Sequence, residues 1–198
     1  MRIAKNKGLG LVSSASDIAN MQYVLMDLGP YKKYFGKPAT NVKIMVHGQP
    51  GAGKSYFLLK FANWFAKNKG SAMYIAAEEY GSPTLAEKLK DIKEELSNNL
   101  KFSGSIKEAL TNYEFDLVVI DSIQAAKLSL DDFSELLKRW PNTAFVLVLQ
   151  KTKEGKFKGA KDWEHDIDIA GEVRFDDEGK RIMHVYKNRY QVMGENPI

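Results

Sequence analysis

The apolar positions of this chain follow two alternating patterns, one of helical and one of strand character. Between residues 57 and 65 the large apolar side chains recur every three or four positions, which places them on one face of a helix. The runs at 115–120 and 143–150 are short and continuous, as is typical of strands buried on both faces of a parallel sheet. The expected strands are Val42–His47, Ser71–Ala77, Phe115–Ile120 and Thr143–Gln150, and the expected helices are Gly53–Lys67, Pro83–Leu96, Ser105–Tyr113 and Leu130–Trp140. This order predicts an α/β fold with a mainly parallel central sheet flanked by helices.

The two ends of the chain follow other patterns. Gly171–Phe175 and Arg181–Tyr186 flank a polar turn that ends in Gly179, which predicts a C-terminal antiparallel hairpin at one edge of the sheet. Residues 1–41 are less regular, although Ser16–Leu28 is compatible with a helix that ends before Gly29 and Pro30. We therefore expect an N-terminal extension, 1–41, that is available for contacts in an oligomer, followed by one core domain, 42–198.

Composition narrows the function classes only slightly. The formal net charge is +4, which a solvated surface explains as well as a nucleic-acid partner does. Cysteine is absent, and this excludes disulfide frameworks, thiolate metal sites and cysteine nucleophiles. No apolar run approaches the roughly 18 residues of a membrane span, and no apolar signal-peptide core follows the first residues. A cytoplasmic protein without a membrane partner is expected.

A glycine-rich segment lies between the first expected strand and the helix that follows it. Gly48, Gly53, Lys54 and Ser55 match the pattern G-x-x-x-x-G-K-[ST], which cradles phosphates with backbone N–H groups and a helix N-terminus. Lys54 is expected to reach the β- and γ-phosphates and the Ser55 hydroxyl to ligate Mg²⁺. The predicted ATP-binding residues are Gly48, Gln49, Pro50, Gly51, Ala52, Gly53, Lys54, Ser55 and Tyr56. The segment therefore predicts a P-loop that binds ATP with Mg²⁺.

Polar side chains follow three other expected strands. Asp121 comes directly after a buried run, where it is expected to hold the magnesium shell, although such a residue alone is often a turn cap. Glu78 and Glu79 end another strand, and Glu78 is the first choice for the group that orients the attacking water. Gln150 ends a third strand and is expected beside the γ-phosphate. Because open parallel sheets bind ligands at the carboxyl ends of their strands, these side chains are expected in one site.

These motifs together resemble the RecA-like ATPase superfamily, and most closely the ATPase core of the bacterial RadA (Sms) branch-migration family. The similarity runs from Val42 to Tyr190, and its last part is the most specific. The blocks that carry it are Gly48–Ser55, Tyr74–Glu79, Leu117–Gln124, Thr152–Gly155 with Gly159, Trp163–His165 with Asp168, and Lys187–Tyr190. The resemblance implies a RecA-like P-loop fold, and it makes residues 42–198 an ATPase core.

The resemblance also implies an oligomer, a ring or a filament, in which ATP lies between subunits. Lys187 and Arg189 occupy the place of the family's cationic pair, which reaches the γ-phosphate of the neighbouring subunit. Strand alternation puts both on one face. On the residues alone, an exposed basic strand end is the preferred interpretation of the pair, and the resemblance reverses this preference. The chain departs from the family at Gln191, where the pattern has glycine; it also lacks the cysteines of the family's zinc finger and stops before its Lon-protease-like domain, so we expect a minimal core.

A lysine-rich segment follows the last buried strand. In RecA-like proteins the matching loop contacts single-stranded DNA, and Phe157 offers a ring on which a base can stack. The predicted DNA-binding residues are Lys153, Lys156, Lys158 and Lys161, and Lys151 adds a further cation. A solvated charged loop is the alternative interpretation.

Two function classes remain open. The first is a recombination or branch-migration motor that couples ATP hydrolysis to single-stranded DNA, and the lysine-rich segment favours it. The alternative is a RecA-like regulatory or scaffold ATPase that acts on a protein partner. A small-molecule kinase is disfavoured because no second cluster of substrate-binding arginines is visible. The three histidines, His47, His165 and His184, have no spacing typical of a metal site.

Overall fold

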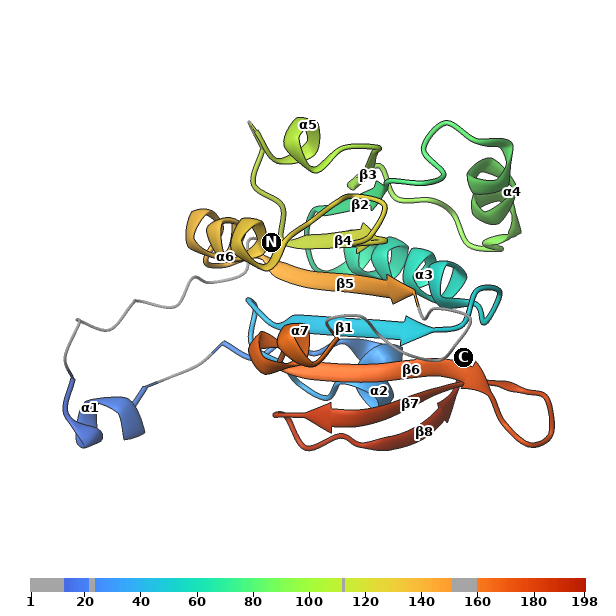
Figure 1. Cartoon of the computed structure of the whole chain (residues 1–198). Helices are drawn as coiled ribbons and strands as arrows, with labels where there is room; N and C mark the ends of the chain where they lie inside the picture. Colours follow the sequence, from blue (N-terminus) through green and yellow to red (C-terminus); the bar gives the residue numbers. More distant parts are fainter. Residues whose placement is uncertain (1–12, 22–23, 112, 151–159) are drawn as a thin grey trace.

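The computed structural model of the chain describes residues 13–21, 24–111, 113–150 and 160–198 (Figure 1). Its centre is an eight-stranded sheet in the order β3-β2-β4-β5-β1-β6-β7-β8. The strands from β3 to β6 in this order are parallel, whereas β7 and β8 are antiparallel additions at one edge. The strand bounds are β1 Lys43–Gly48, β2 Ala72–Ala76, β3 Leu100–Ser103, β4 Leu117–Asp121, β5 Ala144–Gln150, β6 Ile169–Phe175, β7 Arg181–Asn188 and β8 Gly194–Pro197. The predicted fold class is confirmed.

Helices cover both faces of this sheet. Along β1, Ile44 and Val46 face the core cluster that contains α3, whereas Met45 faces the opposite cluster with side chains of α6 and α7. This alternation follows from the period of two residues along a strand. The helix bounds are α1 Ala15–Ala19, η1 Gly29–Tyr31, α2 Lys32–Phe35, α3 Lys54–Asn68, α4 Pro83–Asp91, α5 Ile106–Leu110, α6 Leu130–Arg139 and α7 Ala160–Asp166. In Figure 1, α3 and α2 lie behind the sheet, and α5, α6 and α7 lie in front of it.

The helices begin where the sequence carries capping signals. Ser129 and Asp132 form a reciprocal capping box at the start of α6, which ends just before Pro141. Ser82 caps α4, which has proline at its first position. The expected end of this helix at residue 96 was wrong, because α4 ends at Asp91 and Ile92 turns into an extended conformation and is buried.

Tertiary hydrogen bonds explain this early end. The side chain of Asn63 on α3 donates from Nδ2 to the carbonyl of Glu95 at 3.2 Å and accepts from the amide of Ser97 at 2.8 Å. These contacts hold residues 95–97 against α3 in a form that a continuing helix does not provide, since a helix uses those backbone groups internally.

The expected helix Ser16–Leu28 was also wrong. Among the described residues of this span, the helix is confined to Ala15–Ala19, and in Figure 1 it lies apart from the sheet. Further along, Leu28 and Phe35 are fully buried in the core cluster of α3. Tyr31 packs edge-on against Phe61 with ring centroids 4.9 Å apart. The apolar residues of the second half of this segment are therefore satisfied by packing on α3 rather than by a helix of their own.

Among the described residues, five elements were not expected from the sequence, namely η1, α2, β3, α7 and β8. The edge strands β3 and β8 are short, and each is defined by pairing with one neighbour, β2 or β7. Helix α7 follows the lysine-rich segment, and its Trp163 is buried against Phe133 with ring centroids 5.7 Å apart. The predicted helix Ser105–Tyr113 is present as the shorter α5.

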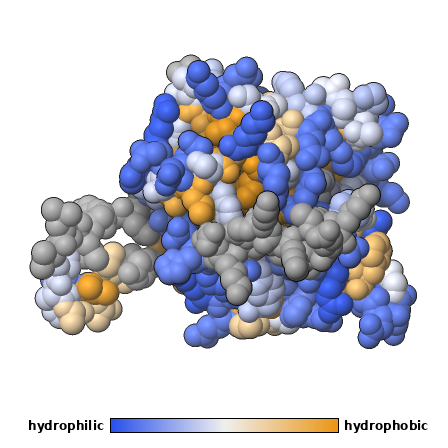
Figure 2. All heavy atoms as spheres, in the orientation of Figure 1, coloured by the Kyte–Doolittle hydropathy of each residue, from blue (hydrophilic) through white to orange (hydrophobic). Residues whose placement is uncertain are grey.

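The face that carries α5, α6 and α7 is mostly hydrophilic. Figure 2 shows apolar side chains gathered between α5 and α6 on this face. Ile106, Leu128 and Leu136 line the groove there and are partly buried against the core. Within the described residues, no helix is both long enough and apolar enough to cross a lipid bilayer.

Candidate active site

The P-loop joins the end of β1 to the start of α3, as predicted. Gly48 has a φ of 148°, and a Cβ there would lie 2.2 Å from the carbonyl oxygen of Val173. Gly53 directly precedes α3 in the left-handed conformation with a φ of 101°. Both positions therefore require glycine, because an L side chain is strained at these angles and clashes at the first of them.

Lys54 is the buried cation of this loop. Only 6% of the residue is exposed, and its Nζ donates to the carbonyl oxygens of Gly48 and Gln49, at 2.9 Å each. Burial lowers the pKa of Lys54, and the nearby charges of Asp121 and Glu78 oppose that shift. The two carbonyl oxygens thus hold the ammonium group at the loop. Its positive charge lies where a phosphate group would bind.

Asp121, at the end of β4, is held by a tyrosine. Tyr74 is buried in β2, and its hydroxyl donates a 2.6 Å hydrogen bond to Oδ2 of Asp121. Burial, and then the charge of Asp121, raise the pKa of Tyr74 well above its usual value, so this hydroxyl remains a donor. No role for Tyr74 was predicted from the sequence, although a tyrosine in a continuous buried strand signals a hydroxyl that needs a partner.

Ser55 and Asp121 fit a magnesium site. Both side chains line one cleft with Lys54, and the cleft has a volume of about 170 Å³. One carboxylate and one hydroxyl are a donor set that Mg²⁺ accepts, because this ion usually keeps several waters and takes its other ligands from substrate phosphates. The residues present therefore fit the predicted cofactor.

The two adjacent glutamates have different partners. Oε1 of Glu78 accepts from Nε2 of Gln150 at 3.0 Å and from the hydroxyl of Ser122 at 3.3 Å. Glu79 instead forms an ion pair with Lys88, whose Nζ lies 2.6 Å from Oε2. Glu78 is thus hydrogen-bonded to two residues at the ends of β4 and β5. The negative charge of Glu79 is instead paired with Lys88 of α4. Lys88 was not predicted as a site residue, because nothing in the local sequence links it to Glu79.

The cleft brings most of the predicted residues together. It is lined by Pro50, Gly51, Lys54, Ser55, Glu78, Glu79, Asp121 and Gln150, with Tyr74, Ala76, Leu59, Leu85 and Lys88 completing it. Tyr56, predicted among the ATP-binding residues, points elsewhere: its hydroxyl donates to the carbonyl of Asp91 at 3.0 Å. It lines a second cavity of about 390 Å³ with Gly53, Arg181 and Ile198. This second cavity adjoins the P-loop through Gly53.

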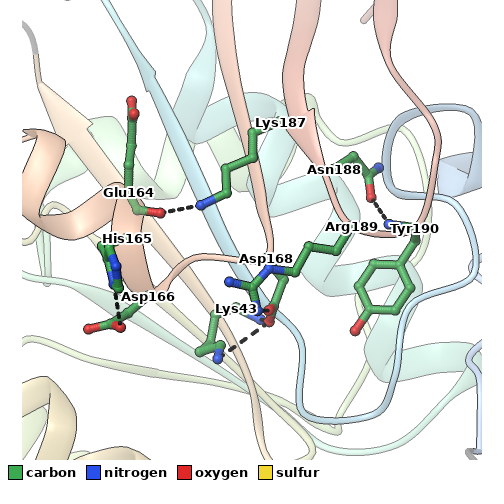
Figure 3. Close-up of polar contacts among 9 residues, drawn as sticks. All are labelled: Lys43, Glu164, His165, Asp166, Asp168, Lys187, Asn188, Arg189 and Tyr190. Carbon is green, nitrogen blue, oxygen red and sulfur yellow. Dashed lines mark hydrogen bonds and ion pairs between the residues drawn. The ribbon is translucent and has the colours of Figure 1, made fainter.

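Lys187 and Arg189 lie at the ends of the strands opposite to the P-loop. Asn188 pairs with Ile169, which in turn pairs with Ile44 near the start of β1, whereas the P-loop follows the end of β1. In Figure 1, β7 points away from the P-loop for this reason. Figure 3 shows that Lys187 reaches Glu164, where its Nζ donates to the backbone oxygen, and that Arg189 reaches Asp168. The two cations are therefore remote from the phosphate loop of their own chain.

Most of the predicted DNA-binding lysines cannot be compared with the structure. Lys153, Lys156 and Lys158 lie outside the described residues, and Lys161 belongs to α7. Of the histidines, His47 is buried in β1, and its Nε2 lies 2.9 Å from the hydroxyl of Tyr186. His165 is exposed beside Asp166.

Comparison with known proteins identifies the family. Residues 41–154 match the family model described as "AAA domain". The chain belongs to this family of AAA-domain ATPases. It is also similar to a protein named DNA repair protein RadA from Streptococcus pyogenes serotype M6, with 28% identity over 200 residues that cover 88% of this chain and 43% of the relative. The protein of the same name from Helicobacter pylori strain J99 is 32% identical over 165 residues, which cover 74% of this chain and 37% of that one.

The AAA-domain chain spans less than half of the length of these curated relatives. Among solved structures it is similar to the flagellar accessory protein FlaH from Methanocaldococcus jannaschii, with a TM-score of 0.60 and 15% identity. That match covers 89% of this chain and 92% of the FlaH chain, and at this identity it shows the fold alone. Together these similarities make the chain a RecA-like P-loop ATPase related to RadA.

Proposed function

We propose that this AAA-domain protein hydrolyses ATP with Mg²⁺ and couples the hydrolysis to binding or remodelling of single-stranded DNA. The observation that carries the proposal is the convergence of Lys54, Ser55, Glu78, Asp121 and Gln150 in one cleft on the P-loop. A phosphate-binding loop, a magnesium-type donor pair and a carboxylate held by a neutral amide are the parts that phosphoryl transfer to water requires.

Each residue has a distinct part in the proposed reaction. The P-loop amides and Lys54 bind the phosphates and stabilise the charge that develops on the transferring group. Ser55 and Asp121 would hold Mg²⁺, which would supply further positive charge to the phosphates. Glu78 orients the attacking water and takes its proton, and Gln150 holds Oε1 of Glu78 in place at 3.0 Å. Glu79 is a weaker candidate because Lys88 already pairs with it at 2.6 Å.

A DNA partner is supported by the chain order around Gln150. The lysine-rich segment begins at residue 151, directly after the residue that contacts Glu78. DNA bound by Lys153, Lys156, Lys158 and Lys161 would therefore act on the segment that directly follows Gln150, the residue that contacts Glu78. The name DNA repair protein carried by the curated relatives supports the same partner.

A second copy of the chain completes the proposed site. Lys187 and Arg189 lie at the ends of the strands remote from their own P-loop, so we assign them to the γ-phosphate of a neighbouring subunit. An arginine supplied from another subunit stabilises the transition state of phosphoryl transfer. The proposal is therefore a homo-oligomer, a ring or a filament, with ATP between its subunits.

The experiment that tests this function is the steady-state rate of ATP hydrolysis, measured with and without single-stranded DNA over a range of protein concentrations and with Mg²⁺ or EDTA. The rate per subunit is expected to rise with protein concentration and with DNA, and to vanish in EDTA. Hydrolysis that needs Mg²⁺ but ignores DNA at every protein concentration would favour the alternative, a regulatory ATPase with a protein partner.

A further inference from the structure

A buried carboxylate, that of Asp168, lies beside Arg189. Asp168 is 7% exposed and sits between the end of α7 and the start of β6. Its Oδ1 lies 3.1 Å from Nη1 of Arg189, and its Oδ2 accepts from the amide of Lys43 at 2.9 Å. The ammonium group of Lys43 lies 3.7 Å from the same Oδ2. Figure 3 shows Arg189 and Lys43 converging on this one carboxylate.

Backbone hydrogen bonds fix the position of Asp168. Its amide donates to the carbonyl of Lys43 at 2.9 Å, and its own carbonyl accepts from the amide of Arg189 at 3.0 Å. Three segments far apart in the sequence thus meet at residue 168, each with a main-chain contact. A carboxylate anchored in this way can determine where a flexible side chain bound to it lies.

Arg189 is held on one side and open on the other. Its side chain is 57% exposed, whereas that of Asp168 is 10% exposed. A guanidinium group has five N–H donors in a rigid planar fork, so a contact through Nη1 leaves further donors for an anion. The Lys43 amide and ammonium both contact Oδ2 of Asp168, whereas Oδ1 faces Arg189. The ion pair therefore ties the exposed guanidinium of Arg189 to a carboxylate whose other oxygen is held by Lys43.

We propose that Asp168 is the positioning residue for Arg189: it orients the guanidinium toward the γ-phosphate bound by a second copy of this chain. The inference rests on the proposed shared site and goes beyond it by naming the residue that prepares the cation. Asp168 touches neither nucleotide nor water in this scheme. Its effect falls on the transition state through Arg189, and so on kcat rather than on the affinity for ATP.

Asp168→Asn is the variant that separates the contact of this side chain with the Lys43 amide from its contact with Arg189. Asparagine retains one side-chain oxygen, which can still accept from the Lys43 amide, but it then turns its NH₂ donors toward the guanidinium of Arg189. The expected result is a kcat lower by roughly 10- to 100-fold with an unchanged KM for ATP, since a small misplacement of a transition-state group has effects of this size. Asp166→Asn is the matched control, because this exposed aspartate contacts His165 rather than Arg189; its kcat is expected to equal that of the wild type.

Mixing experiments show on which subunit Asp168 acts. Asp168→Asn mixed with Glu78→Gln is expected to regain activity, because some interfaces then combine an intact Glu78 with an Arg189 held by an intact Asp168. A wild-type kcat in Asp168→Asn would overturn the inference. A loss that mixing does not repair, under conditions in which Arg189→Ala mixed with Glu78→Gln does recover, would also overturn it. If instead Arg189→Ala itself fails to recover, the shared site is wrong and the positioning role is rejected with it.

Folding is checked in the same samples by circular dichroism and thermal melting. Should Asp168→Asn be unfolded, Asp168→Glu is measured by the same two criteria, since it keeps the charge and moves the carboxylate by one methylene. A folded Asp168→Glu with wild-type kcat would mean that the position of this carboxylate is unimportant, and a kcat loss repaired by mixing would support the inference.

Discussion

Gln150 and Glu78 are joined by a 3.0 Å hydrogen bond from Nε2 to Oε1, although their strands β5 and β2 are not neighbours in the sheet. The bond spans the end of β4, whose last residue is Asp121. A neutral amide thereby fixes the orientation of the proposed catalytic carboxylate. The lysine-rich segment starts at the next residue. A movement of that segment that displaces Gln150 would therefore also displace its hydrogen bond to Glu78.

Lys54→Ala is expected to lower kcat by at least about 100-fold, because it removes a positive charge from the transferring phosphoryl group. The far-ultraviolet circular dichroism spectrum is expected to remain that of the wild type. ATP hydrolysis by both proteins is the measurement. Lys67→Ala, an exposed position in the last turn of the same helix, is the control and is expected to keep full activity. Full activity in Lys54→Ala would show that the P-loop assignment is wrong.

Glu78→Gln and Glu79→Gln form a matched pair. Glu78→Gln is expected to lower kcat by about 100-fold or more while leaving the affinity for ATP unchanged, since it removes the proton acceptor and little binding energy. Glu79→Gln is expected to have a much smaller effect because this carboxylate is occupied by Lys88. Single-turnover hydrolysis and nucleotide binding are measured on each variant. The reverse order of effects would assign the water-orienting role to Glu79.

Replacing Lys153, Lys156 and Lys158 together with alanine is expected to weaken binding of single-stranded DNA. The slope of log affinity against log salt concentration should fall by about 0.7 for each phosphate contact that is lost. Fluorescence anisotropy of a labelled oligonucleotide at several salt concentrations measures this slope. A triple variant at the exposed lysines Lys67, Lys90 and Lys93 controls for net charge. The same slope in wild type and loop variant would leave the segment as a solvated face.

Arg189→Ala is expected to bind ATP with normal affinity but to hydrolyse it about 10³-fold more slowly, the lower end of the effect of an arginine supplied in trans. Specific activity of the wild type should rise with protein concentration as the oligomer forms. Mixing Arg189→Ala with Glu78→Gln should restore part of the activity, since each supplies what the other lacks. Co-assembly without any recovery would argue for a site contained in one chain.

Tyr74→Phe is expected to lower the free energy of unfolding by about 1–3 kcal/mol, because a hydrogen bond to a charged group is lost from a buried position. It should also raise the Mg²⁺ concentration needed for half-maximal activity, since Asp121 loses the donor that orients it. Urea denaturation and a magnesium titration provide the two measurements. Tyr113→Phe, at a tyrosine that is 67% exposed, is the control and should change neither quantity.

The parts of this protein that the sequence determined are those that depend on neighbouring residues. The P-loop is a strand, a glycine turn and a helix in succession, so its residues and their conformation follow from one segment. Glu78, Asp121 and Gln150 could be placed together because parallel strands end at one edge of a sheet. The C-terminal hairpin was equally local, and Gly179 donates to the carbonyl of Asp176 in its turn.

Tertiary structure decided the relationships between distant residues. Lys88 and Gln150 distinguish Glu79 from Glu78, and neither contact has a local signal. The predicted helix at Ser16–Leu28 failed because burial of Leu28 against α3 outweighs a weak local propensity. The antiparallel direction of β7 places Arg189 beside Asp168, far from its own P-loop. These outcomes depend on hydrogen bonds and packing between segments that meet only in the folded chain, which no pattern within a single segment encodes.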